Sequence, residues 1–402
     1  MRCLLAANRT ALQAPGSRLR ALAKALCPTP VALSLVGSLA LLAPAALAQA
    51  PAQGPGTDWS QFRGNAPLTA VASIAPADNL TLRWTYDAGS ALESSAIISG
   101  GTVYVGAADG VLLAVDVDTG KLRWKYSTGE GGFIGESTPA IAQDTVYIGD
   151  LGGTVHAVDA HDGHKRWTFK TNAEVKSSPV VVGDLVLIGS YDTHLYALDA
   201  RTGAVRWKLK TEGPVHATPA VQNGVAYLGG CDQQFRAVRV SDGKVLFQIP
   251  LGAYTGASTA LDGDRAYVGT FDSEVVGIDV RTRKVLWRYA DKDRNFPYYS
   301  SAALSGGRVV VGGRDKAVHA LEAATGKPAW SFATRARVDS SPAVSGGRVY
   351  IGSSDGKLYV LDLVTGQKRW EFATGDAITG SPAIAGGRVV IGSSDGRIYC
   401  FS

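Results

Sequence analysis

The chain has 402 residues, of which 46% are hydrophobic, so it is long enough to bury a large core. Its formal net charge of +5 arises entirely in the first 48 residues, where the basic side chains of Arg2, Arg9, Arg18, Arg20 and Lys24 stand without an acidic one. The remainder carries as many acidic as basic residues, which excludes the positive field expected of a nucleic-acid-binding protein.

Residues 1–48 have the pattern of a secretory signal peptide. The basic stretch leads into an apolar run from Val31, and Ala46 and Ala48 place small residues at −3 and −1 relative to cleavage after Ala48. Cys27 precedes that run and follows Leu26, which is unlike a lipobox, so no lipid anchor is expected. We expect a periplasmic or secreted protein without a transmembrane segment in the mature chain.

Residues 49–79 are interpreted as an N-terminal extension, and residues 80–402 as a single repeat domain. One phrase recurs through that domain, for example "ALDARTGAVRW" at 197–207 and "VLDLVTGQKRW" at 360–370. Its terminal aromatic residues are spaced by 40 or 43 positions from Trp124 to Trp370. A period near forty indicates a supersecondary unit that is stable only when stacked on its neighbours.

Each unit is predicted to contain four short antiparallel strands. In one unit these are 340–344, 348–352, 357–362 and 367–372, separated by Gly- and Asp-rich turns. Such units in series predict an all-β fold, a β-propeller of four-stranded blades. The chain ends on a third strand, 397–402, and the isolated strand 80–86 supplies the fourth, so we predict a ring of eight blades closed by that pairing.

The consensus "A-x-D-x-x-T-G-x-x-x-W" resembles the repeat of the pyrroloquinoline-quinone (PQQ)-like propeller family, and the resemblance covers about residues 80–402. "DWSQFRGN" (58–65) is similar to a leader found before such propellers, and we expect it to pack on the ring. The resemblance implies that the consensus Trp docks against the turn of the neighbouring blade. This structural role would fall to Trp84, Trp124, Trp167, Trp207, Trp287, Trp330 and Trp370. Arg239, Phe247 and Arg283 depart from the consensus.

The family resemblance also implies a possible quinone-dependent oxidoreductase. In those enzymes the cofactor stacks on a Trp floor beneath bonded adjacent cysteines, beside a calcium ion held by carboxylates. Here Cys231 and Cys400 are far apart and expected to be buried and inert, and only Trp59 is not at a docking position. We therefore predict a non-enzyme with no catalytic residue and no bound cofactor.

No metal site is predicted either. His161 and His164 fall on an outer turn, where a solvated turn is the better interpretation than zinc binding. The repeated aspartates Asp109, Asp192, Asp232, Asp272, Asp315, Asp355 and Asp395 are interpreted as turn residues that bond their own backbone.

Antiparallel strands sort the loops onto two faces. The loops between blades share one face, called face one, with the loops between second and third strands, whereas the remaining turns share face two. Face one carries Phe133, Tyr191, Tyr254, Phe271, Phe296, Tyr298 and Tyr299, and gathered aromatics are typical of an interaction surface. Both 43-residue intervals lengthen face-one loops, 126–137 and 289–300, which lead into the opposed second and sixth blades.

Within the family, "FIGESTPA" (133–140) is similar to the partner-binding loop of the BamB propellers, lipoproteins of the outer-membrane β-barrel assembly machinery. That resemblance implies partner binding by Phe133, Ile134, Gly135 and Glu136, to which the face-one aromatics add Tyr191, Phe271, Phe296 and Tyr298. The leading hypothesis is an exported monomeric scaffold that binds an envelope protein, in the setting of the outer-membrane assembly machinery. The alternatives are a small PQQ-dependent oxidoreductase and a glycan- or polymer-binding propeller.

Overall fold

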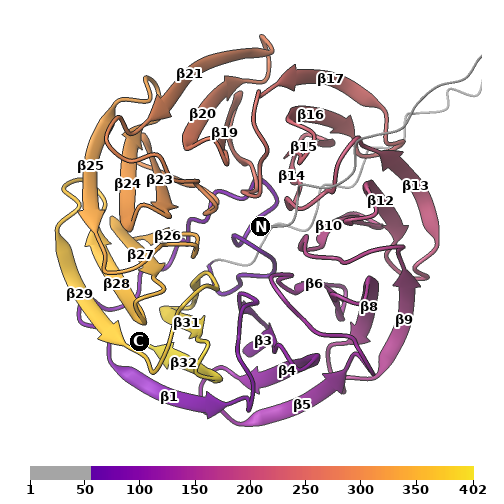
Figure 1. Ribbon diagram of the computed structural model, residues 1–402. Coiled ribbons are helices and arrows are strands. Elements are labelled where there is room, and N and C mark those ends of the chain that lie inside the picture. The colour runs from indigo at the N-terminus through magenta and orange to yellow at the C-terminus, as the bar shows by residue number, and fades with distance from the viewer. Residues whose placement is uncertain (1–55) are drawn as a thin grey trace, which may run out of the picture. The chain divides into compact units, whose positions relative to one another are not determined.

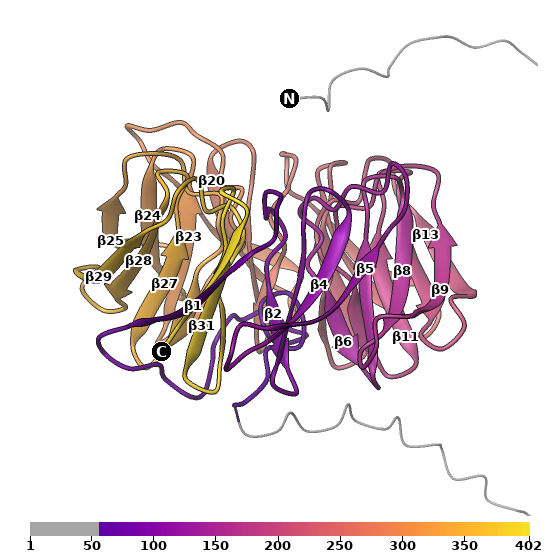
Figure 2. The ribbon, with the colours of Figure 1, turned by 90° about the horizontal axis from the view of Figure 1, so that it is seen from below.

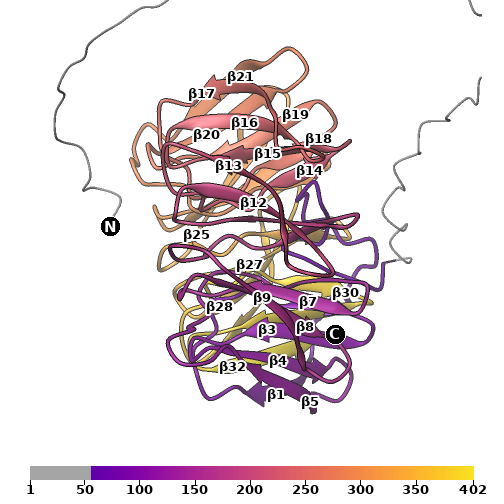
Figure 3. The same cartoon turned by 90° about the vertical axis from the view of Figure 1, so that its right-hand side faces the viewer.

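The computed structural model describes residues 56–402, and the predicted signal peptide lies outside them. The described chain forms 32 strands in eight separate four-stranded antiparallel sheets, arranged as blades around a central channel (Figure 1). Views from the side show a ring whose loops gather along its two faces (Figure 2, Figure 3). The predicted all-β, eight-bladed propeller is confirmed.

The seventh blade shows how the sequence builds each unit. Its strands are β26 (Ala343–Ser345), β27 (Arg348–Gly352), β28 (Lys357–Asp362) and β29 (Lys368–Ala373). The innermost strand is shorter than the predicted 340–344 because Pro342 has no N–H to donate to a ladder. Between β28 and β29 the register shifts at Val360/Leu361, and a β-bulge of this kind increases the local twist.

The other complete blades repeat this plan from the channel outward. Their strands are β2–β5 (Ile97–Ser99, Thr102–Gly106, Val111–Asp116, Leu122–Ser127), β6–β9 (Ala140–Ala142, Thr145–Gly149, Thr154–Asp159, Lys165–Lys170), β10–β13 (Val180–Val182, Leu185–Gly189, His194–Asp199, Val205–Lys210), β14–β17 (Ala220–Gln222, Val225–Gly229, Gln234–Arg239, Val245–Pro250), β18–β21 (Ala260–Asp262, Arg265–Gly269, Glu274–Asp279, Lys284–Ala290) and β22–β25 (Ala303–Ser305, Arg308–Gly313, Ala317–Glu322, Pro328–Ala333). The two middle strands of each blade are almost wholly buried, whereas the outer strand mixes exposed residues with half-buried or buried ones.

The eighth blade closes the ring by joining both ends of the domain. It contains β30 (Ala383–Ala385), β31 (Arg388–Gly392) and β32 (Arg397–Phe401), and β1 (Leu82–Asp87) adds its outer strand. Thr81 and Ser402 exchange both backbone hydrogen bonds, at 2.9 and 3.1 Å. The predicted closure is therefore confirmed, with the strand shifted slightly from 80–86.

The consensus Trp side chains dock between blades. The indole Nε1–H of Trp167 donates to the Ala200 carbonyl oxygen of the next blade at 3.0 Å, and the equivalent bond recurs for Trp84, Trp124, Trp207, Trp287 and Trp330. Each ring lies over the turn glycine of that blade: a Cβ on Gly203, whose φ is +73°, would stand 2.6 Å from the Trp167 ring. Trp370, beside the closing blade, packs against Phe401 instead.

One junction uses a different pair of residues. Arg283 replaces the turn glycine and keeps its left-handed backbone, with φ of 59°. The aromatic residue that faces it is Phe247 instead of Trp, and the guanidinium carbon lies 5.2 Å from the centre of the Phe247 ring. The smaller ring leaves room for the Arg Cβ, and the cation–π contact offsets part of the backbone strain.

Residues 56–79 run across the face-two end of the channel, visible in indigo at the centre of Figure 1. Their backbone bonds the innermost strands or adjoining turns of the first, second and fourth to eighth blades, for example Trp59 with Ile98 at 2.7 Å and Ala70 with Val344 at 2.8 Å. Trp59, Leu68 and Ala70 are buried against the blades. The segment therefore forms a floor under the channel.

Candidate functional site

The channel wall is built from one small polar residue per blade. Each stands two positions before the innermost strand, and the eight are Ser95, Thr138, Ser178, Thr218, Ser258, Ser301, Ser341 and Ser381. The backbone N–H of one residue donates to the hydroxyl of the next blade, as from Thr218 to Ser258 Oγ at 2.9 Å. Such bonds run from Thr138 round to Ser95 and link the blades into a belt, called here the hydroxyl ring.

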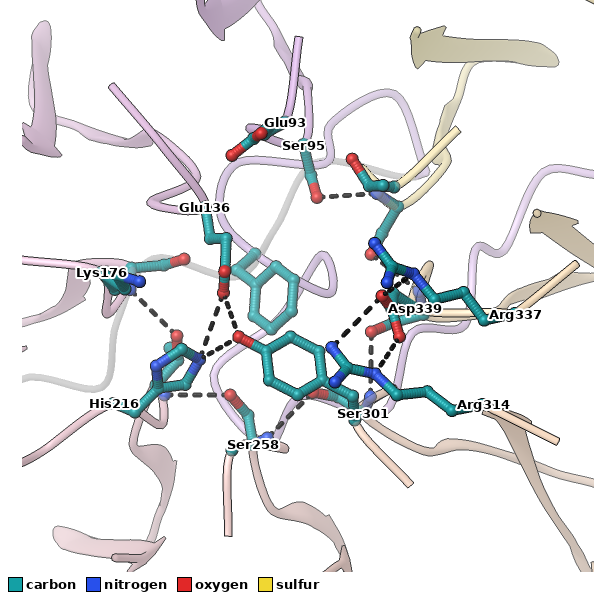
Figure 4. A pocket seen from close by; sticks show the side chains of 18 residues that line it. Glu93, Ser95, Glu136, Lys176, His216, Ser258, Ser301, Arg314, Arg337 and Asp339 are labelled. Carbon is teal, nitrogen blue, oxygen red and sulfur yellow. Dashed lines mark hydrogen bonds and ion pairs between the residues drawn. The ribbon is translucent and has the colours of Figure 1, made fainter. Parts of the chain in front are cut away.

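A second ring of side chains lies nearer to face one. Because alternate residues of an extended chain point the same way, the residue two places before each hydroxyl also faces the channel. These residues are Glu93, Glu136, Lys176, His216, Gly256, Tyr299, Asp339 and Thr379. They surround the mouth of a cavity of about 210 Å³, whose lining also includes Phe62 from the floor segment (Figure 4).

Tyr299 bridges the channel mouth from one side to the other. Its hydroxyl comes from the loop before the sixth blade and donates to Glu136 Oε2, before the second blade, at 2.6 Å. It also lies 2.9 Å from Nε2 of His216, which precedes the fourth blade. Glu136 can only accept hydrogen bonds and lies 3.2 Å from the same nitrogen, so Nε2 carries a proton, and Tyr191 bonds Nδ1 at 2.7 Å.

The contact among Glu136, His216 and Tyr299 shifts the pKa values of the groups at the mouth. Partial burial opposes the charged form of Glu136, but the hydrogen bond and charge of His216, aided by Tyr299, lower the pKa of Glu136 to about 2. Burial and the Glu136 carboxylate together raise the pKa of Tyr299. The bridge therefore joins a carboxylate to a neutral phenol across physiological pH.

Cations occupy the opposite side of the mouth. The guanidinium of Arg314, between β23 and β24, donates from Nε to Asp339 Oδ1 at 2.8 Å and lies 4.6 Å from the centre of the Tyr299 ring. Arg337 Nε lies 3.0 Å from the other oxygen of Asp339. Lys176, in contrast, lies on the side of Glu136 and His216, with its Nζ 5.3 Å from the centre of the Tyr191 ring (Figure 4). One carboxylate therefore serves two arginines, and their remaining N–H groups face the cavity region (Figure 4).

The residues predicted to bind a partner divide into three groups. Phe133 and Phe296 are exposed, by 56% and 51%, on the two lengthened loops. Tyr191 and Phe271 are half-buried beside the Tyr299 bridge, and Glu136 belongs to it.

The third group is buried. Ile134 and Tyr298 are 1% and 3% exposed and fill the core beneath the lengthened loops, so neither offers surface to a partner in this structure. Gly135 is also buried and packs against Leu151. For Ile134 the physical reason is alternation, because in an extended chain the residue next to the exposed Phe133 points the opposite way, toward the core. Tyr298 stands two positions after Phe296 and is buried by packing against His319, with ring centres 5.4 Å apart.

Sequence reasoning missed the channel-mouth residues Lys176, His216, Tyr299, Arg314, Arg337 and Asp339 as a group. A signal for several of them was present, because Lys176, His216, Tyr299 and Asp339 all stand two places before the recurring Ser or Thr. No such signal marks Arg314 and Arg337, which arrive from other loop positions. Their convergence depends on the closed ring.

One three-residue cluster among the described residues offers metal-binding atoms within 4.8 Å of one another, namely Asp291, Asp315 and His319. His319 Nε2 lies 2.9 Å from Asp315 Oδ2, and Arg294 approaches the same carboxylate. An Asp150–His156 pair at 2.8 Å supports the corresponding loop of the second blade. We interpret both pairs as supports for the lengthened loops.

Other predictions concern isolated residues. Cys231 and Cys400 are both buried, and burial raises the pKa of Cys400 to about 12, so it is a poor nucleophile. Six of the seven repeated aspartates accept a backbone N–H group of their own turn, as Asp355 does from Lys357 at 3.1 Å; the described residues show no such bond for Asp272. Within residues 56–402 no helix is long and apolar enough to span a membrane.

The family can now be stated. The sequence matches the family of repeat propellers described as outer membrane protein assembly factor BamB, over residues 71–174, 151–296 and 296–402. The chain belongs to this family. Among curated proteins no match is found.

Several solved structures share the fold at low sequence identity. BamB from Moraxella catarrhalis superposes with a TM-score of 0.68 at 18% identity, covering 81% of this chain and 98% of that one. A europium-containing methanol dehydrogenase gives 0.72 at 16% identity, covering 87% and 98%. Quinohemoprotein alcohol dehydrogenase from Comamonas testosteroni gives 0.75 at 15% identity, covering 87% and 81%. These likenesses concern the fold alone.

Proposed function

We propose that this protein is a non-enzymatic scaffold of the cell envelope that binds a protein partner through face one. The observation that carries the proposal is the pair Phe133 and Phe296. They stand 163 residues apart at the same place in opposed blades, each on a loop lengthened by three residues, and each more than half exposed. Exposed aromatic anchors on a rigid scaffold are typical of binding hot spots.

Both anchors are held by the fold beneath them. The Phe133 carbonyl oxygen accepts the Leu151 N–H at 2.8 Å, and the next residue, Ile134, is buried in the core. Beside Phe296, the Pro297 carbonyl accepts the Arg314 N–H at 3.2 Å, and Tyr298 is buried. A preorganised aromatic side chain loses little conformational entropy on binding.

The class of partner follows from the family. BamB is described as an outer membrane protein assembly factor. We therefore propose an envelope protein as the partner, with the outer-membrane assembly machinery as its setting, after export to the periplasm.

The dehydrogenases among the similar folds make an oxidoreductase the main alternative. The channel-mouth residues do not fit PQQ, however. Tyr299 lies across the mouth on Glu136 and His216, and the cavity of about 210 Å³ is below the range of about 300–1,000 Å³ typical of cofactor sites. No Trp lines that cavity among the described residues. These observations favour the scaffold.

Site-specific photo-crosslinking in the native host tests the proposal. A photoreactive amino acid replaces Phe133 or Phe296, and the control position is Val364, an apolar residue 68% exposed on a face-two turn. We expect a discrete protein adduct from the two face-one positions and none from Val364. Equal labelling of both faces, or no adduct at all, would refute the proposal.

Two binding measurements separate the alternatives. Uptake of PQQ by the purified protein with the appearance of dye-linked alcohol oxidation would favour the oxidoreductase. Binding on a glycan panel that is lost in Phe133→Ala would favour a glycan-binding propeller.

A further inference from the structure

The hydroxyl ring has hydrogen-bonding capacity that the fold does not use. Seven of its members line the cavity: Ser95, Ser178, Thr218, Ser258, Ser301, Ser341 and Ser381. Each of these oxygens accepts a backbone N–H of the preceding blade. Within residues 56–402 the seven donate no hydrogen bond in return. A hydroxyl carries one donor, so seven O–H groups around the channel are available to a ligand.

Several carboxylate oxygens around the mouth, in contrast, already accept hydrogen bonds. Glu136 Oε2 already accepts from Tyr299, at 2.6 Å, and Asp339 binds Arg314 and Arg337 with its two oxygens. Each arginine has further N–H groups beyond these contacts. Glu93 also lines the cavity, with a carboxylate that has no hydrogen-bond partner among residues 56–402. The unused donors, which are seven hydroxyls and the remaining arginine N–H groups, outnumber the unused carboxylate oxygens, and this favours a ligand made of acceptors.

The floor adds a buried cation without a counter-ion. Arg63 is 1% exposed, and its guanidinium donates one bond at 2.9 Å to the carbonyl oxygen of Ala302, the residue after Ser301. Its Nε and Nη1 atoms, and Nε2 of the neighbouring Gln61, have no hydrogen-bond partner in the described part of the chain. The guanidinium carbon lies 5.9 Å from the ring centre of Phe62, which lines the cavity.

Burial of the Arg63 guanidinium without a counter-ion lowers the stability of the folded protein. Among residues 56–402 no carboxylate forms an ion pair with Arg63, and burial lowers the pKa of its guanidinium to about 9. A charge held in a low-dielectric interior needs a partner to offset the loss of hydration. Arg63 does not itself line the cavity, but it follows Phe62, which does, and its field is weakly screened because the guanidinium is buried.

We propose that the channel binds a small oxyanion, with the chemistry of phosphate, sulfate or a carboxylate group, on the hydroxyl ring above Arg63. The cavity of about 210 Å³ admits such an ion together with water and is too small for a large cofactor. The hydroxyls supply hydrogen bonds, and Arg63 supplies the compensating charge. The site is distinct from the exposed phenylalanines proposed to bind a partner.

Isothermal titration of the purified mature protein with inorganic phosphate at pH 7 tests this site, with sulfate and acetate as comparison anions and glucose as a neutral polyol. We expect saturable one-to-one binding of at least one anion and none of glucose. Ser341→Ala and Arg63→Met are each expected to weaken that binding by about tenfold or more, because each removes a hydrogen bond or a charge that stabilises the bound ion.

Ser340→Ala is the matched control. Ser340 is buried like its neighbour, and its hydroxyl also accepts a backbone N–H, from Gly352 at 3.2 Å, but it does not line the cavity. We expect this variant to bind the anion as tightly as the wild type. Binding of glucose but of no anion would overturn the proposal, as would anion binding that Ser341→Ala and Arg63→Met leave unchanged.

A direct measurement covers the case in which a variant fails to fold. Wild-type crystals soaked in selenate locate the anion by anomalous scattering. We expect a peak within the hydroxyl ring. Peaks confined to surface sites at saturating selenate would refute the proposal, whatever the crosslinking experiment at face one shows.

Discussion

Glu136 and Tyr299 occupy equivalent positions, 163 residues apart, before the second and sixth blades. The same repeat position therefore supplies an acceptor on one side of the channel and a donor on the opposite side. Tyr299 is long enough to reach Glu136 Oε2 at 2.6 Å, and His216 supplies a second donor. The bridge is a direct side-chain contact between opposed sides of a ring in which each blade packs mainly on its two neighbours.

The bridge predicts a contribution to acid stability. The pKa of Glu136 is lowered to about 2 in the folded protein from an ordinary 4.5, so its stabilising effect is present above about pH 4.5 and is lost as pH falls toward 2. We expect Glu136→Gln to reduce the loss of unfolding free energy between pH 5 and pH 3. The effect is modest because the side chain is 38% exposed. Urea denaturation at both pH values measures it.

Glu130→Gln, in the same lengthened loop, controls for the removal of one negative charge. Tyr299→Phe should shift the pH dependence in the same direction as Glu136→Gln, since it removes a donor to the carboxylate. Identical pH dependence of wild type and Glu136→Gln would show that the bridge does not hold the carboxylate charged.

At the scale of the element, the forty-residue repeat predicts most of the fold. Strand order, blade number and ring closure were predictable because each depends on a pattern that recurs about every forty residues, whereas Trp docking was implied by the family resemblance. The site was predictable only in part. Phe133 was implied by the family resemblance and Phe296 by the aromatic residues of face one, but the burial of Ile134 and Tyr298 depends on how each loop enters the core. The convergence of Arg314 on Asp339 depends on two neighbouring blades together.

The docking of Trp rings on turn glycines predicts a difference between two glycine substitutions. Gly183 and Gly203 both have positive φ, 60° and 73°, but a Cβ at Gly183 meets nothing within 4 Å, whereas one at Gly203 meets the Trp167 ring at 2.6 Å. We expect Gly183→Ala to cost about 1 kcal/mol for the left-handed backbone. Gly203→Ala should cost about 1–3 kcal/mol more from overpacking.

Thermal and urea unfolding of the two variants test this difference. Trp167→Phe in the Gly203→Ala background should recover part of the loss, as the natural pair Phe247 and Arg283 implies. Equal destabilisation by the two glycine substitutions would mean that the ring moves aside freely and that docking contributes little.

At the scale of the whole molecule, two devices keep a ring of weakly coupled blades together. One is the pairing of β1 with β32, which removes the sheet edges that an open ring would expose. The other is the floor segment, whose backbone bonds to innermost strands and turns on almost every side of the channel. Closure joins two neighbouring blades, whereas the floor joins blades that are not adjacent.

The floor predicts that removing it weakens the ring as a unit. A chain starting at residue 80 keeps the closing strand but loses the backbone bonds of Trp59, Ala70 and Ala72 and uncovers the apolar surface that they and Leu68 bury. Relative to a chain starting at residue 56, we expect a lower unfolding temperature, a broader transition and stronger binding of a hydrophobic dye. Calorimetry and dye fluorescence measure these changes. If the two chains unfold at the same temperature with equal sharpness, the ring holds by closure and Trp docking alone, and the floor serves only to line the channel.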